Sequence, residues 1–273
     1  MTKRTNRNVL ICSVVGILIL TAASVAWGRG LAKVENTIHN LSATGVDPAI
    51  GGAGSSFYAT NEDQICVFCH TPHGGILDGP LWNHSTPSNT SFTHYNSVTL
   101  SSVLQGLSVS RIVNDESLIC MSCHDGSISV NHLINVPNDR TTPIETLFNN
   151  DPDTEIIDLF GGVGSRIGAA PGNTSGTGDL TDDHPISFSY SDVLADPAYG
   201  VGGSKENELR TVLAATTYKG EGIRFFGTND RVECSSCHDP HVDYVSGINS
   251  NNYTPFLIRP NTGSDLCLSC HNK

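Results

Sequence analysis

The sequence predicts a mostly irregular fold, with short helices and a few short strands. Its 273 residues include 27 glycines and 13 prolines, and runs with helical or strand periodicity are few. Aliphatic periodicity this sparse cannot build a polypeptide core unaided. Eight of the nine cysteines, however, fall in one recurring pattern, which indicates what fills the interior.

That pattern is Cys-x-x-Cys-His, and it occurs four times. The two thiols of such a motif add to the vinyl groups of a porphyrin, and the histidine beneath the ring binds the iron. We therefore expect four covalently bound haems c and a multihaem cytochrome c fold whose core is built on stacked haems. The attachment cysteines are Cys66, Cys69, Cys120, Cys123, Cys234, Cys237, Cys267 and Cys270, and the proximal ligands are His70, His124, His238 and His271.

Structural zinc is the alternative for these motifs, because paired cysteines also form zinc sites. Zinc does not require a histidine directly after each pair. With 11 histidines in 273 residues, four such coincidences have odds on the order of one in a million if positions are independent. The pattern favours haem.

The N-terminus has the features of a signal peptide. Basic residues occur within the first seven positions, an apolar run covers residues 9–20, and residues 24–26 form a small-x-small cleavage site. We expect residues 1–26 to be removed on export. The alternative is a retained membrane anchor, but the apolar run is short for a bilayer span.

Export agrees with the chemistry of thioether attachment and places the mature chain outside the cell or at its surface, with the periplasm as the alternative. Loss of three basic residues with the signal peptide changes the formal net charge from -12 to -15. A surface this acidic is an unfavourable partner for nucleic acid, and no membrane span is expected after cleavage.

The rest of the chain divides into four segments. These are an N-terminal arm (27–61), haem sites one and two (62–132), a long haem-free segment with a glycine-rich loop (133–233), and haem sites three and four (234–273). Periodicity predicts a helix over 113–123, a strand over 186–190 and a helix that begins at Ser204. The acidic stretch 151–158 lacks the spacing of a calcium loop, so a solvated acidic loop is favoured.

Each iron needs a sixth ligand or an open position, and this choice separates an electron carrier from a catalyst. Histidine–methionine ligation is excluded, because the one methionine beyond the signal peptide, Met121, lies inside the second motif. Seven histidines remain outside the motifs, which is three more than four bis-histidine haems require. They are His39, His73, His84, His94, His132, His184 and His241.

His73 and His241 occupy identical settings, each three residues beyond a proximal histidine with a proline between them. Neither can reach the distal face of the haem beside it, so each is predicted to bind the iron of a different haem. The alternative is a pair of surface imidazoles.

His184 lies in the middle of the haem-free segment, where an iron ligand would explain why that segment folds back; the alternative is a turn histidine between acidic neighbours. His132 is the reserve ligand, and we expect His84 and His94 to be solvated. His39 lies on the arm, where it completes either an iron of an adjoining subunit or one in its own chain.

The short segments that flank the motifs are more specific to one protein family than the motifs themselves. They include the Thr-Pro-His that follows the first motif, Pro80–Asn83, the Asp-Gly that follows the second motif, Asp183–Phe188, and the Asp-Pro-His that follows the third. In these segments the chain resembles the doubled Cys-x-x-Cys-His multihaem c-type cytochromes. It is most similar to the tetrahaem outer-surface cytochrome E type, which polymerises into extracellular conductive filaments (nanowires).

The resemblance implies bis-histidine haems in a continuous chain, with one axial histidine supplied by the adjoining subunit. His39 is the candidate for that role, and a head-to-tail contact of this kind repeats into an open filament. We expect an exported electron-transfer protein, with redox proteins or extracellular acceptors as partners. The alternatives are a periplasmic electron shuttle and a multihaem reductase with one open iron. An enzyme is disfavoured, because histidines are in surplus and no motif ends in lysine.

Overall fold

The computed structural model describes residues 34–37, 39–44, 57–59, 61–75, 81–85, 91–125, 133–137, 144, 146–148, 179–220, 222–244 and 250–272. The predicted signal peptide, His132, the acidic stretch 151–158 and most of the glycine-rich loop lie outside these residues. Within them, no helix is long and apolar enough to cross a membrane.

The described chain is mostly irregular, with short helices and short strands, as predicted. The strands are β1 (Phe57–Ala59), β2 (Ser91–His94), β3 (Ser110–Ile112), β4 (Thr146–Phe148), β5 (Asp179–Leu180), β6 (Phe188–Ser189) and β7 (Arg231–Val232). The α-helices are α2 (Ser102–Gly106), α3 (Asp115–His124), α5 (Tyr190–Ala195), α6 (Val212–Thr216) and α7 (Cys234–Cys237). The 3-10 helices are η2 (Val34–Asn36), η3 (Ile65–Phe68), η5 (Tyr218–Gly220), η6 (Ser250–Tyr253), η7 (Thr262–Ser264) and η8 (Cys267–Ser269).

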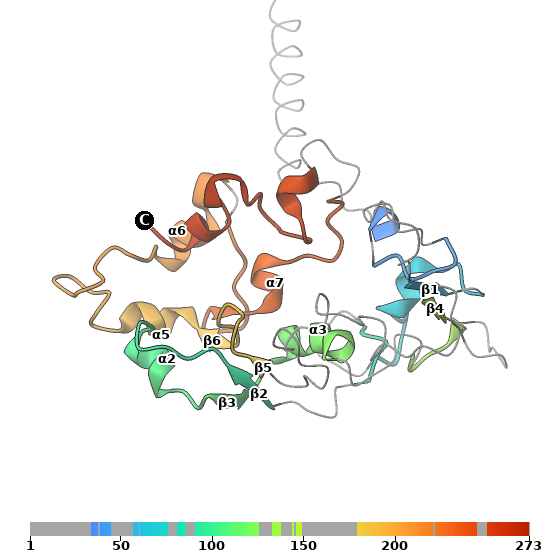
Figure 1. Ribbon diagram of the computed structural model, residues 1–273, viewed down its shortest axis with the longest axis horizontal. Coiled ribbons are helices and arrows are strands. Elements are labelled where there is room, and N and C mark those ends of the chain that lie inside the picture. Colours follow the sequence, from blue (N-terminus) through green and yellow to red (C-terminus); the bar gives the residue numbers. More distant parts are fainter. Residues whose placement is uncertain are drawn as a thin grey trace, which may run out of the picture.

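The strands form three small sheets. β1 pairs antiparallel with β4, and β6 pairs antiparallel with β7. The third sheet has the order β3-β2-β5, with β2 antiparallel to β3 and parallel to β5. Figure 1 shows α3 and α7 in the middle of the molecule, between the β1–β4 sheet at one end and the C-terminus and α6 at the other.

Each Cys-x-x-Cys-His motif lies on a helical turn: η3, the end of α3, α7 or η8. In the first, third and fourth motifs the backbone N–H of the histidine donates to the carbonyl of the first cysteine, at 2.8, 3.0 and 2.9 Å. The second motif forms the same turn inside α3. The sequence pattern therefore produces one repeated local geometry, which presents two thiols and an imidazole together.

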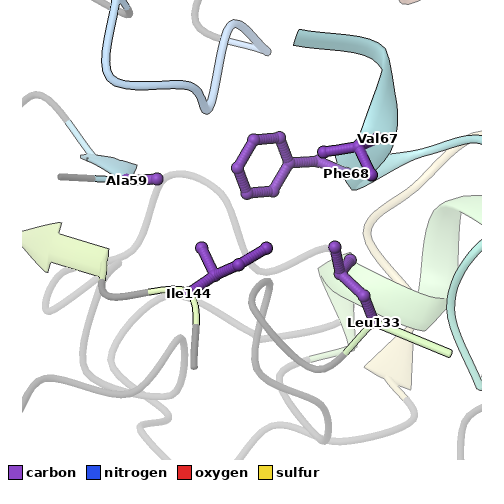
Figure 2. Close-up of a cluster of buried hydrophobic side chains, with 5 residues drawn as sticks. All are labelled: Ala59, Val67, Phe68, Leu133 and Ile144. Carbon is purple, nitrogen blue, oxygen red and sulfur yellow. The ribbon is translucent and has the colours of Figure 1, made fainter. Parts of the chain in front are cut away.

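Buried apolar side chains form several small clusters, each close to an attachment motif. Figure 2 shows the cluster at the first motif, where Val67 and Phe68, the residues between its two cysteines, pack with Ala59, Leu133 and Ile144. Met121, from the second motif, is fully buried in another cluster. Among the described residues these clusters are small and separate, and the motifs contribute side chains to them.

The carboxylate of Glu233 lies between the second and third motifs and is fully buried. It accepts hydrogen bonds from Asn114 Nδ2 at 2.8 Å, Ser117 Oγ at 2.5 Å, Ser187 Oγ at 2.8 Å and Arg231 Nε at 3.0 Å. Glu233 also caps α7, with its side chain accepting from the backbone of Ser236. A buried carboxylate with this many donors holds α3, α7 and the start of β6 in one arrangement.

Two element predictions were wrong or partly wrong. The predicted helix over 113–123 is confirmed as α3, whereas the strand over 186–190 is reduced to β6, because Ser189 caps α5 by accepting from the N–H of Asp192. No helix begins at Ser204. Asn207 has a φ of 61°, which breaks a right-handed helix, and the next helix is α6, capped by Thr211.

The prediction that His84 and His94 are solvated was also wrong. Both are buried, with relative exposures of 0% and 1%. His94 lies on the central strand of the three-stranded sheet, and its Nε2 is 3.3 Å from the carbonyl of Arg111. Burial, with the nearby Arg111 guanidinium, lowers the pKa of His94 to about 4. His94 is therefore neutral near pH 7.

We predict that His94 makes the protein sensitive to acid. Between pH 6.5 and 4 the unfolded chain protonates this histidine and the folded chain largely does not, so the free energy of unfolding falls by roughly 3 kcal/mol as the pH is lowered through this range. In His94→Gln that part of the loss should be absent. Urea unfolding midpoints of both proteins at pH 7 and pH 4 measure it. An identical loss in both would contradict the assignment.

Candidate haem-attachment and axial-ligand sites

The eight motif cysteines are free thiols. Several of them have a pKa that is shifted by a cysteine of another motif, which indicates which motifs lie next to each other. Burial raises the pKa of Cys123 to about 12, with a contribution from Cys69 of the first motif. Cys120, from the same motif, is hydrogen-bonded to Cys234 of the third motif, which raises the pKa of Cys120 and lowers that of Cys234. The second motif thus faces the first with one thiol and the third with the other.

The third motif repeats this arrangement. Burial raises the pKa of Cys237 to about 11, with contributions from Cys234 and from Cys267 of the fourth motif. Cys237 in turn contributes to the raised pKa of Cys270. The motifs therefore follow one another in the order one, two, three, four. Cys66 of the first motif and Cys267 of the fourth are the exposed cysteines, so each end of the order reaches the surface.

His70 and His241 form an imidazole pair across the molecule. Their ring centroids are 6.2 Å apart and their planes are nearly parallel, at 8°. His70 belongs to the first motif, while His241 follows the third. His241 therefore lies opposite the histidine of a motif other than its own neighbour, the kind of position that the duplicated sequence pattern predicts.

His39 and His124 form a second pair, with centroids 6.0 Å apart and planes at 70°. His39 also stacks on Phe256 at 4.3 Å and 13°. Its Nδ1 is buried and has no hydrogen-bond partner among the described residues. Burial, together with His124 and His241, lowers the pKa of His39 to about 3, so the imidazole is neutral.

From the sequence, His39 completes either an iron of an adjoining subunit, as the resemblance implies, or an iron in its own chain. In the structure of the single chain His39 lies beside His124, and the choice between the two stays a prediction. The physical reason for the place beside His124 is Phe256, which is buried and gives the arm an aromatic surface to pack on. That surface comes from a distant segment and is not visible in the sequence of the arm.

Both pairs have the spacing that an iron with two axial imidazoles requires. Metal–nitrogen bonds of about 2 Å on each side separate the two ring centres by roughly 6 Å. The two pairs, at 6.2 and 6.0 Å, fit a bis-histidine iron, and each contains one proximal histidine of a thiol-bearing motif. The donor set therefore fits haem c at the first and second motifs.

Three of the predicted ligands hold their Nδ1 atoms in hydrogen bonds. The acceptors are the Pro255 carbonyl for His238 at 2.8 Å, the Pro185 carbonyl for His184 at 2.9 Å and the Asp239 carboxylate for His241 at 2.8 Å. Such a bond fixes the tautomer with Nδ1 protonated, which leaves Nε2 as the atom able to bind a metal.

The structure brings together four of the eight predicted ligands, His70, His241, His39 and His124, as two pairs. His73, His184 and His238 are exposed, and His271 is half-buried, in an antiparallel bridge with Leu209. The acidic neighbour of His184, Asp183, contributes to the pKa of Cys234, so that segment passes close to the third motif. The pairing of these last four histidines stays a prediction from the sequence.

Sequence reasoning missed three residues of the site. Phe256 supports His39, and Trp82 lies edge-on to His70 at 6.1 Å while its Nε1 donates to Ser122 Oγ in the second motif at 3.0 Å. Asp239 accepts a hydrogen bond from His241. The one sequence signal for it is that the two similar segments, His70–His73 and His238–His241, differ at this position, where one has Thr71 and the other Asp239. No family model matches the chain, and the search of curated proteins finds no relative.

Proposed function

We propose that the protein is an exported tetrahaem c-type cytochrome that carries electrons over long distances outside the cell. The observation that supports this most strongly is the order of the thiols. Each inner motif directs one cysteine to the motif before it and the other to the motif after it. Four haems attached to these cysteines would form one continuous row.

The chain would act by holding its cofactors close together and closing both axial positions. When bound, the four haems supply one-electron, outer-sphere redox chemistry. His70 with His241 and His39 with His124 would fill both axial positions at the first and second motifs, which leaves no open position for a substrate there. These residues favour an electron carrier over a multihaem reductase.

Cys66 of the first motif and Cys267 of the fourth are exposed, which supports electron entry and exit at the outer motifs. In a filament, identical subunits would meet head-to-tail through these ends; in either case redox proteins or extracellular acceptors are the partners. The periplasmic shuttle is the second candidate, and the position of His39 beside its own His124 favours it. Electron microscopy of the secreted fraction separates the two, since only the first candidate gives filaments.

Haem attachment is tested by the intact mass of the exported protein. We predict a mass that includes four haems, iron without zinc by metal analysis, and a reduced protein that resists carbon monoxide at neutral pH. Resistance is expected because imidazoles fill both axial positions. Fewer than four haems, or zinc in the motifs, would overturn the proposal, and rapid carbon monoxide binding at one haem would favour the reductase.

We predict that His39→Ala retains four haems but opens one iron to carbon monoxide, because the second motif loses its distal imidazole. His94→Gln is the matched control, since His94 is buried in a sheet and should leave all four irons closed. Dilute wild-type monomer, isolated by gel filtration, separates the two positions considered for His39. It should remain closed to carbon monoxide, and one open iron in each monomer would show that the ligand comes from another subunit.

A further inference from the structure

We propose that Asp239 is a positioning residue that makes His241 a more electron-rich ligand and so lowers the reduction potential of the haem that His70 and His241 would share. This inference rests on the proposed function. It assigns a role to a carboxylate that is neither a predicted iron ligand nor part of a haem-attachment motif.

Asp239 contacts His241 in two ways. Its Oδ1 accepts from His241 Nδ1 at 2.8 Å and from the His241 backbone N–H at 3.0 Å. Its Oδ2 accepts from Arg224 Nη2 at 3.0 Å. The backbone N–H of Asp239 donates to the carbonyl of Phe256 at 2.8 Å, which fixes the start of the turn. The carboxylate is mostly buried, at 17% exposure, and is held from both sides.

A carboxylate on Nδ1 changes the properties of the other ring nitrogen. It draws the Nδ1 proton toward itself and raises the basicity of Nε2, so the imidazole donates more electron density to a metal. A stronger donor stabilises the oxidised iron more than the reduced iron, which lowers the reduction potential. Arg224 partly neutralises the carboxylate, so the two residues oppose each other in setting that potential.

Two similar segments of the sequence, His70–His73 and His238–His241, allow the surroundings of His241 to be compared with those of His73. In His70-Thr71-Pro72-His73, Thr71 occupies the position that Asp239 has beside His241. The Thr71 hydroxyl donates to the carbonyl of His73 at 2.9 Å, so this position offers no carboxylate to the His73 ring. His184 and His238 donate to neutral carbonyls. Of the three histidines whose Nδ1 hydrogen bonds are described above, His184, His238 and His241, only His241 has a charged acceptor.

The lowered reduction potential would affect the first haem in the row of four. The first motif is terminal, with Cys66 exposed, and a lowered potential there disfavours an electron resting on that haem. An electron shared among the four haems would occupy the inner ones more often. The transfer is internal, with one iron oxidised as its neighbour is reduced, and no bond or proton need change.

The test uses the holoprotein with four haems verified by intact mass, titrated by spectroelectrochemistry. In Asp239→Asn, one of the four potentials should rise, with at least a tenfold change in the equilibrium constant for reduction, or about 59 mV for one electron. All four haems should stay low-spin. Arg224→Gln should move the same potential downward, which keeps the test valid if Asp239→Asn fails to fold. Asp265→Asn is the control, because Asp265 also pairs with two cations, Lys219 and Arg259, without contacting His241.

A double-mutant cycle shows whether Asp239 acts through His241. In the His241→Met background the imidazole is gone, so adding Asp239→Asn should produce little further shift. An equal shift in both backgrounds, or no shift in either Asp239→Asn or Arg224→Gln, would overturn this inference while leaving four attached haems and the proposed function intact. A protein without haem would instead overturn the proposed function.

Discussion

The middle of the molecule depends on one buried carboxylate, that of Glu233. Hydrogen bonds from Asn114 and Ser117 tie it to α3, one from Ser187 ties it to the segment before β6, and its own backbone begins α7. Removing such a group would leave several buried donors unsatisfied, at a cost of about 1–3 kcal/mol for each. Because the second and third motifs lie on α3 and α7, Glu233 fixes how their thiols meet. Local motif geometry and long-range order are thereby coupled in a chain whose described residues form only small apolar clusters.

This coupling explains why a chain that is mostly irregular can still place redox sites reproducibly. Each motif folds as a single helical turn closed by a hydrogen bond from its histidine N–H or by α3 itself. The first, second and fourth motifs also contribute side chains to small apolar clusters. The turns need little surrounding secondary structure. The contact between neighbouring motifs, however, depends on residues that are distant in the sequence. Buried polar groups such as Glu233 fix this contact, because their hydrogen bonds are directional.

Sequence reasoning succeeded where the information is local and failed where it depends on pairing between distant segments. The motifs and α3 follow from adjacent residues. The burial of His94 depends on the pairing of β2 with β5, which comes from a distant part of the chain, so the polar neighbours of His94 in sequence were misleading. The contact of His39 with Phe256 could not be predicted either, because nothing in the sequence of the arm shows that Phe256 packs on it. Asp239 was missed, although it is the residue in which the two Cys-x-x-Cys-His-x-Pro-His segments differ from each other in charge.

The central claim is that the four attachment motifs form one row in sequence order. An experimental map of the haem-loaded protein tests it most directly, because the haems and their thioether bonds are visible in such a map. The account predicts that the haem on Cys120 and Cys123 lies between those of the first and third motifs, with the Cys120 sulfur beside that of Cys234. A map in which the haems of the second and third motifs are not neighbours, or in which another haem separates them, would contradict it.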